Sequence, residues 1–197
     1  YRSETFHCTV TVKLDEDGGG ALVQTASAEI GQGSDTTMAM FAAETLGISL
    51  ERVRVVSGDT ELGIDLGAYS SRTTLMTGHA TTQAAAHALE QVLEAVAEEL
   101  GVERRRLSAR RGKIKIKGDA DIQPLRTRYL KEHRGWDGLP AGPELSFSEA
   151  ARVAYLKRGT IVGTGAYRPP ALGGKYKGAA VGTSPAYGCS AQVAEVS

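Results

Sequence analysis

Residues Glu29-Ile30-Gly31-Gln32-Gly33-Ser34-Asp35-Thr36 mark the point where a strand is expected to end and a capped helix to begin. Glycines on both sides of a glutamine let backbone N–H groups close around an anion. The helix that follows directs its free N–H groups and its positive dipole end to the same place. The glutamine side chain adds a donor and an acceptor. The stretch therefore predicts a loop that binds an anionic ligand.

A hairpin is predicted to lead the chain into this loop. The sequence alternates from Phe6 to Leu14, breaks at the turn residues 15–20 and resumes from Ala21 to Ala28. After the loop, Ser34 or Asp35 is expected to cap a helix.

The apolar residues of this helix lie three and four positions apart. They are Met38, Phe41, Ala42 and Leu46. Gly47 is expected to end the helix because it tolerates positive φ. Residues 52–56 then alternate as a further strand.

The longest element is predicted to be a helix from Thr74 to Leu100, stopped by Gly101. Its expected apolar stripe comprises Leu75, Thr82, Ala85, Ala86, Leu89, Leu93, Val96 and Leu100. Ser146 to Glu149 is typical of a capping box that opens a helix through Leu156.

Further strands are predicted at 113–117, 160–166 and 186–196, with a long surface loop over 118–144. This order of elements predicts an α+β fold with a mixed β-sheet packed with helices. Residues 1–197 are interpreted as one cofactor-binding region, with a lobe at 1–101, a variable excursion at 102–145 and a second lobe at 146–197. Whether the two lobes are ββαβ-like repeats is left open, because no strong self-similarity is found.

A second candidate loop precedes the long helix. Residues 66–74 combine small residues, the hydroxyls of Ser70 and Ser71, and Arg72, which can pair with an anion. If the sheet aligns the two loops, Gln32 and Ser71 face one ligand. Two alternatives stay open: Ser71 and Thr73 as helix caps, and Arg72 in a structural ion pair.

Composition limits the class of protein. The chain has 197 residues, no formal net charge and 41% hydrophobic residues, which predicts a globular fold with a substantial core. No apolar run is long enough for a membrane span, and no leader follows Tyr1, as in an excised piece. Cys8 and Cys189 lack ligand spacing and are interpreted as free thiols in a reducing cytoplasm.

A basic run, Arg104 to Lys117, invites comparison with nucleic-acid-binding segments. A solvated face is the preferred interpretation, because acidic residues balance the charge and no aromatic residues interleave the run. Binding to coenzyme A phosphates or to a partner subunit stays open. The four histidines do not cluster at the spacing of metal ligands, so no metal site is predicted.

Several motifs in the same order resemble the molybdenum-binding subunit of the xanthine oxidase and aldehyde oxidase family. They are Glu29-x-Gly31-Gln32-Gly33-x-x-Thr36, Ala43-Glu44-x-Leu46-Gly47-Ile48, Asp59-Thr60, Gly67-x-x-Ser70-Ser71-Arg72-Thr73 and Gly78-x-Ala80. Within that family, residues 62–73, 167–170 and 178–187 look most like the large subunit of 4-hydroxybenzoyl-CoA reductase.

The resemblance implies a site for a molybdenum-pterin cofactor, in its simple or cytosine dinucleotide form. Gln32 would contact the cofactor, with Gly31 and Gly33 shaping the loop. Ser70, Ser71 and Thr73 would contact its phosphate region. No protein side chain would ligate the metal, and the glutamate that acts as general base in the family's hydroxylases would lie beyond Ser197. The fragment alone is expected to be inactive.

The resemblance also implies a cytoplasmic holoenzyme with iron–sulfur and FAD subunits, with no role for nucleic acid or membrane. The expected reaction is reductive dehydroxylation of the aromatic acyl-CoA substrate 4-hydroxybenzoyl-CoA to benzoyl-CoA. One alternative is a molybdenum hydroxylase of an aldehyde, purine or other N-heterocycle. Another is a non-catalytic interaction module that has lost the cofactor.

Overall fold

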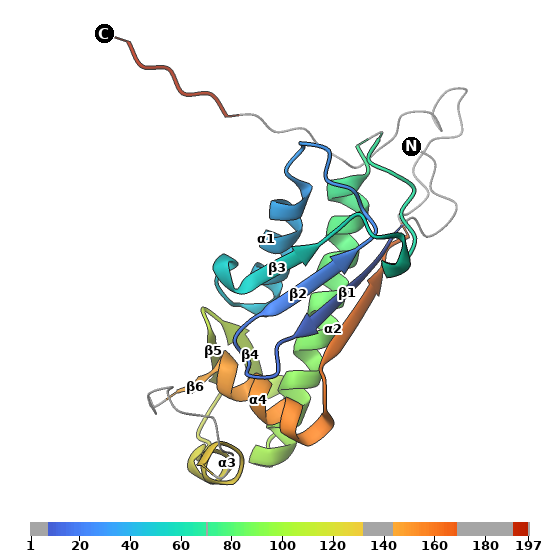
Figure 1. The fold of residues 1–197 in the computed structure, drawn as a ribbon. Coiled ribbons are helices and arrows are strands. Elements are labelled where there is room, and N and C mark those ends of the chain that lie inside the picture. Colours follow the sequence, from blue (N-terminus) through green and yellow to red (C-terminus); the bar gives the residue numbers. More distant parts are fainter. Residues whose placement is uncertain (1–7, 70, 132–143, 169–190, 197) are drawn as a thin grey trace, which may run out of the picture.

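The protein is represented by a computed structural model that describes residues 8–69, 71–131, 144–168 and 191–196. Its centre is a four-stranded sheet in the order β3-β2-β1-β7 (Figure 1). The strands are β1 (Thr9–Leu14), β2 (Ala21–Thr25), β3 (Val53–Val56) and β7 (Val162–Ala166). β1 pairs antiparallel with β2 and with β7, whereas β2 and β3 are parallel. The sheet is therefore mixed, as predicted.

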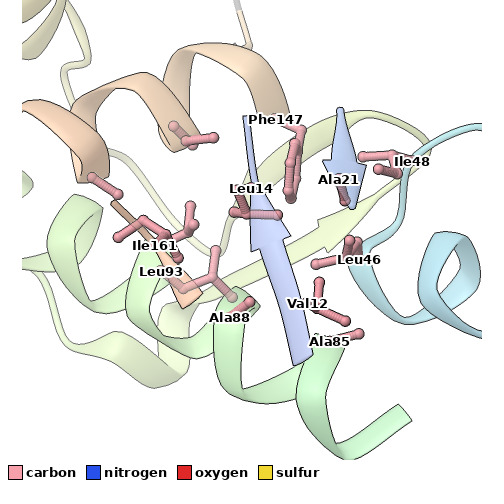
Figure 2. Close-up of a cluster of buried hydrophobic side chains, with 14 of the residues drawn as sticks. Val12, Leu14, Ala21, Leu46, Ile48, Ala85, Ala88, Leu93, Phe147 and Ile161 are labelled. Atoms are coloured by element: carbon pink, nitrogen blue, oxygen red, sulfur yellow. The ribbon is translucent and has the colours of Figure 1, made fainter. Parts of the chain in front are cut away.

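Two helices, α1 (Ser34–Leu46) and α2 (Thr73–Leu100), cover one face of this sheet (Figure 1). β1 alternates between buried and half-buried residues, so Val10, Val12 and Leu14 point into the core. Figure 2 shows side chains from β1, the two helices and the α4 residue Phe147 gathered in one cluster. The second half of the chain therefore shares the core of the first half.

A smaller sheet has the order β4-β5-β6 and is followed by helix α4. These elements are β4 (Leu107–Arg110), β5 (Lys113–Ile116), β6 (Leu145–Ser146) and α4 (Phe147–Arg158). α4 opens with the predicted capping box, in which Ser146 and Glu149 each bond the other's backbone N–H group. β4 is absent from the sequence prediction.

The closest contact between helix and sheet is that of α2 with β7. A Cβ atom on Gly163 would lie 2.0 Å from the Ala84 carbonyl oxygen, and one on Gly165 would lie 2.1 Å from that of Ala80. Only glycine fits at these two strand positions. The strand therefore touches the helix backbone, which requires a helix face made of small residues.

This contact explains why the predicted apolar stripe of α2 is only partly right: Ala85, Leu93 and Val96 are fully buried as predicted, but the other predicted members are not. Leu75, Leu89 and Leu100 are only half-buried, and Ala86 is exposed. The fully buried face is richer in alanine and includes Ala80, Ala84, Ala85, Ala88, Val92 and Val96. The limits of the helix agree with the prediction to within one residue.

The expectations for α1 have mixed outcomes. Gly47 ends the helix with φ 72°, as predicted. The predicted cap by Ser34 or Asp35 is wrong, because Gly33 holds the cap position in the left-handed conformation and no side chain caps the helix from there. The hydroxyl of Ser34 donates to Glu29 instead.

Two predictions in the second half also need correction. Residues 118–144 are not simply a loop, because they contain α3 (Gln123–Arg126) and a π-helical turn, η4 (Thr127–Lys131). The predicted strand 186–196 is wrong for residues 191–196, which have no regular secondary structure, while 186–190 lie outside the described residues. Three short 3-10 turns complete the described elements: η1 (Leu50–Arg52), η2 (Thr60–Leu62) and η3 (Arg104–Arg106).

β7 belongs to the predicted lobe 146–197 but pairs with β1 of the predicted lobe 1–101, so strands from both lobes form one sheet. Among the described residues, no helix combines the length and the apolar character that a membrane crossing demands.

Candidate functional site

Two loops meet at one edge of the four-stranded sheet. Loop A (residues 26–33) follows β2, and loop B (residues 57–72) follows β3. β2 and β3 are parallel neighbours, so their carboxyl ends lie at the same edge, and Figure 1 shows both loops there. The predicted alignment of the two loops by the sheet is confirmed. Each loop leads into a helix of at least thirteen residues, α1 or α2.

Direct hydrogen bonds join the loops. The Gly58 N–H group donates to the Ser27 carbonyl oxygen at 2.9 Å. The Ser57 hydroxyl donates to the carboxylate of Asp35, in the first turn of α1, at 2.9 Å. Loop B also reaches β1, because the Thr9 N–H group donates to the Ile64 carbonyl at 3.1 Å.

Loop A is organised around the carboxylate of Glu29. Its Oε1 atom accepts from the N–H groups of Gly31 at 2.7 Å and Gly33 at 3.0 Å. Its Oε2 atom accepts from the Asp35 N–H group at 3.1 Å and from the Ser34 hydroxyl at 3.2 Å. These hydrogen bonds, led by that of the Asp35 N–H group, lower the pKa of Glu29 to about 2. The glycine N–H groups thus surround an anion that belongs to the chain itself.

The Gln32 side chain is exposed but held in place by its own loop. Its Oε1 atom accepts from the Ile30 N–H group at 2.6 Å. Its Nε2 atom donates to the Ala28 carbonyl at 3.1 Å and to the Ser34 hydroxyl oxygen at 3.0 Å. Gly31 (φ 96°) and Gly33 (φ 75°) both adopt left-handed backbone angles. The predicted role of these glycines in shaping the loop is consistent with these angles.

α2 begins without a side-chain cap. Arg72 occupies the cap position in the αR conformation, and no side chain bonds the first N–H groups from there. The alternative roles of Ser71 and Thr73 as caps are therefore wrong. Ser71 is exposed at φ 54°, an unusual angle for a residue with a side chain, and Thr73 is half-buried. Ser70 lies outside the described residues.

Arg72 is the most unusual residue of loop B, because its guanidinium is buried with few partners. The residue is 5% exposed, its Nη1 atom donates to the Gly67 carbonyl at 3.4 Å, and its Cζ atom lies 4.8 Å from the centre of the Tyr69 ring. The alternative of a structural ion pair has no support among the described residues, where no carboxylate lies within ion-pair distance of Arg72.

Each of the two loops contains a buried polar atom that has no hydrogen-bond partner in the described part of the chain. The two atoms are Nε of Arg72, in loop B, and Oγ of Ser27, in loop A. Buried polar atoms are satisfied in the great majority of cases, so such orphans call for a partner. A cation and an uncapped helix N-terminus at the same place suit an anion.

The thiol of Cys8 lies at the same edge, next to β1. Cys8 is 1% exposed and unpaired, and its backbone bridges to Asp65 of loop B. Burial raises the pKa of this thiol to about 11. The expectation that Cys8 is a free thiol is confirmed, whereas Cys189 lies outside the described residues.

The other candidates from the sequence have structural partners. His79 stacks on Tyr167 with ring centres 4.3 Å apart, and His87 accepts from the Thr164 N–H group at 3.2 Å. No group of three or more possible metal ligands occurs among the described residues. In the basic run, Arg104 pairs with Glu90 and Arg106 donates to the Lys117 carbonyl at 2.8 Å. Much of this run is therefore structural.

Sequence reasoning missed the roles of Glu29, Ser27 and Asp35. Glu29 stands two residues before Gly31, a spacing that allows a carboxylate to reach back over a turn of positive-φ glycines. That spacing is a local signal and could have indicated the contact. The contacts of Ser27 and Asp35 with loop B depend on the pairing of strands in the sheet, so no local signal in the sequence indicates them.

The fold and the edge define a class: an α+β domain with two loop-to-helix junctions at one sheet edge, which carry a glutamine amide, an uncapped helix and a buried arginine. The chain belongs to the Molybdopterin cofactor-binding domain family, which it matches over residues 2–197.

Relatives agree with this assignment. The chain is 32% identical to "Probable hypoxanthine oxidase XdhD" of Escherichia coli (strain K12) over 162 residues, 81% of this chain and 14% of that protein. It is 36% identical over 101 residues, 51% of this chain and 13% of the relative, to the 6-hydroxypseudooxynicotine dehydrogenase complex subunit gamma of Paenarthrobacter nicotinovorans. The chain thus spans a small part of the length of these relatives.

A solved structure has the same fold. Quinoline 2-oxidoreductase from Pseudomonas putida 86 superposes with a TM-score of 0.65 at 25% identity, covering 84% of this chain and 19% of that chain. The predicted α+β fold class is confirmed. The family comprises molybdenum-dependent oxidoreductases related to xanthine dehydrogenase.

Proposed function

We propose that this chain is the part of a molybdenum hydroxylase large subunit that holds the molybdenum-pterin cofactor, in an enzyme that acts on an N-heterocycle. The observation that carries the cofactor proposal is the shared edge of loops A and B. There a buried, unpartnered Arg72 Nε atom and an uncapped helix N-terminus lie on a loop joined by hydrogen bonds to the loop of Gln32.

Each group has a proposed role in holding the cofactor. Gln32 would bond the cofactor through its exposed amide, on a backbone that Gly31 and Gly33 shape. The phosphate end, either of the simple pterin or of its cytosine dinucleotide form, would lie at the N-terminus of α2. Ser71, Thr73 and the Arg72 guanidinium would bond it there, and Ser70 is added from the sequence resemblance alone.

The cofactor, when bound, would supply the two-electron redox chemistry at molybdenum. The described residues would bind and orient it. The hydroxyls of Ser71 and Thr73 and the Arg72 guanidinium suit an anionic phosphate, because each can donate a hydrogen bond to it. Both hydrogens of Gln32 Nε2 go to Ala28 and Ser34, so Gln32 would offer its Oε1 atom as an acceptor to a donor of the pterin. Iron–sulfur and FAD subunits are proposed as the electron partners of the complete enzyme.

The test uses the complete large subunit, expressed in a host that makes the cofactor. Gln32→Ala and Arg72→Gln should each lower the molybdenum and pterin content about 10- to 100-fold, the loss typical of orienting contacts around a metal site. Glu44→Ala is the control, because Glu44 is an exposed carboxylate of α1 whose side chain makes no bond to the described residues. Full cofactor content in both variants would contradict the proposal.

The substrate class is proposed from the relatives, whose printed names include hypoxanthine oxidase, nicotine hydroxylase and quinoline oxidoreductase. Hypoxanthine, nicotine and quinoline are all N-heterocycles. The loaded enzyme should therefore hydroxylate a member of a purine, pyridine and quinoline panel. Turnover of aldehydes alone would contradict this part of the proposal.

A second candidate is reductive dehydroxylation of 4-hydroxybenzoyl-CoA. The likeness of residues 62–73, 167–170 and 178–187 to that reductase favours it, although 169–190 lie outside the described residues. Formation of benzoyl-CoA by the reduced enzyme would select this candidate over the hydroxylase. A third, the interaction module, would be selected by a complete subunit that contains no molybdenum.

A further inference from the structure

Glu29 supplies a carboxylate that bonds N–H groups at the N-terminus of α1. Gly33 at the cap position has no side chain, and no other cap bond is made there. The Glu29 carboxylate instead accepts hydrogen bonds from the N–H groups of Gly31, Gly33 and Asp35. One side chain therefore satisfies the N–H groups of every second residue in this stretch. An ionised carboxylate is the natural partner of a helix N-terminus.

The same carboxylate determines the direction of the next hydrogen bonds. A serine hydroxyl has a single hydrogen, and that of Ser34 points to Glu29 Oε2. The Ser34 oxygen is therefore left as an acceptor, and Gln32 Nε2 donates to it at 3.0 Å. An ionised carboxylate can only accept hydrogen bonds. The direction of donation, from Gln32 to Ser34 and from Ser34 to Glu29, is therefore fixed.

This direction agrees with the other hydrogen bonds of the Gln32 amide. With Nε2 bound to Ser34 and to the Ala28 carbonyl, Oε1 is the atom that meets the Ile30 N–H group. Rotation of the amide by half a turn would place two acceptors together and two donors together. The Ile30 N–H group can only donate and the Ala28 carbonyl can only accept, so these two neighbours select the amide orientation. Glu29 acts on the position of Gln32, because it holds the N–H groups of Gly31 and Gly33 on either side of it and the Ser34 hydroxyl that accepts from it.

We propose that Glu29 is a positioning residue: by holding the N–H groups of Gly31 and Gly33 and the hydroxyl of Ser34, it fixes the place from which Gln32 presents its amide to the cofactor. This inference rests on the proposed function of Gln32. It also implies that the phosphate end of the cofactor is bound at α2 and not at α1, because the N–H groups at the start of α1 already have an anion.

The experiment compares Glu29→Ala, Gln32→Ala and the double variant in the complete, cofactor-loaded enzyme. Glu29→Ala should lower the molybdenum content and turnover about 10-fold or more, the range for groups that orient a ligand. Acetate, added during cofactor loading and assay, should restore most of this loss, since it replaces the missing carboxylate at the same N–H groups. Chloride at equal ionic strength should not.

The double variant separates positioning from a merely structural role. If Glu29 acts through Gln32, the double variant should be no worse than Gln32→Ala, and acetate should not rescue either of them. Glu44→Ala serves as the control for loss of a carboxylate on α1. Should Glu29→Ala fail to fold, Glu29→Gln keeps the side-chain volume without the charge and should still lower the molybdenum content severalfold.

The outcomes distinguish this inference from the proposed function. Full molybdenum content in Gln32→Ala would overturn the role of Gln32 itself. A loss in Gln32→Ala together with wild-type content in both Glu29 variants would overturn only the inference. Additive losses in the double variant, or no rescue of Glu29→Ala by acetate, would likewise overturn it.

Discussion

Single side chains at the carboxyl edge of the sheet show how strongly local surroundings change a pKa. Glu29 is exposed and ionised down to low pH, because several N–H groups bond its carboxylate. Cys8 is buried nearby, and its thiol resists ionisation up to high pH for the opposite reason. The Glu29 carboxyl group thus stays ionised, whereas the Cys8 thiol in the same region stays neutral.

The raised pKa of Cys8 predicts slow alkylation. At pH 8, iodoacetamide should label Cys8 much more slowly in the native subunit than in denaturant, because the thiolate is the reactive form and burial suppresses it. Mass spectrometry of the Cys8 peptide gives both rates. Because the folded pKa is raised from 9.0 to about 11, the neutral thiol contributes stability that is complete below pH 9 and lost as the pH rises toward 11. Equal labelling rates in the two states would show that the thiol is accessible and ordinary.

At the scale of secondary-structure elements, the packing of strand β7 on helix α2 depends on the small size of the strand residues. Gly165→Ala should lower the free energy of unfolding by about 1–3 kcal/mol or more, since the new methyl group meets the helix backbone, which cannot move aside as a side chain can. A Cβ there would lie 2.1 Å from the Ala80 carbonyl oxygen and 2.6 Å from the Ala84 nitrogen. Calorimetry or urea unfolding of the complete subunit measures the loss.

Thr164→Ala is the matched control for this strand. Thr164 lies between the two glycines and is exposed, so its truncation should change stability by no more than about 1 kcal/mol. If the control and Gly165→Ala lower the free energy of unfolding by similar amounts, the close contact between β7 and α2 does not limit residue size at position 165.

At the scale of the whole molecule, one buried ion pair connects α3 with the start of α4. Arg126 donates to Glu149 at 2.8 Å, and both side chains are 5% exposed. Glu149→Ala should cost about 3–5 kcal/mol, because it leaves the Arg126 charge buried without its carboxylate partner. Ser146→Ala, which removes only the other half of the capping box, should cost about 1 kcal/mol. Thermal unfolding of the two variants compares these values, and equal losses would refute the importance of the ion pair.

Local signals in the sequence predicted a good part of this fold. The stop at Gly47 and the capping box at Ser146 were predictable because each depends on residues within about one helical turn. The buried face of α2 was only partly predictable: Ala85, Leu93 and Val96 follow from the apolar spacing. Ala80, Ala84 and Ala88 are selected by Gly163 and Gly165, which lie far along the chain. A leucine stripe looks like the core face until a strand backbone requires alanine there.

The site was predictable to a similar extent. Strand–glycine–helix junctions indicated the two loops, and the parallel pairing of β2 with β3 brought them together. The partners of the loop N–H groups were not predicted, although the spacing of Glu29 before Gly31 is a local signal for them, because that contact also requires the positive φ angles of Gly31 and Gly33. For the same reason, the chain's own carboxylate was not anticipated as the anion.

Hydrogen bonds within residues 29–35 hold loop A in its shape. An apoprotein with such a loop is preorganised, so cofactor insertion does not have to order this segment and loses little conformational entropy there. Maturation of the enzyme would then be limited by delivery of the cofactor and by access to the edge, and not by folding of the glutamine loop.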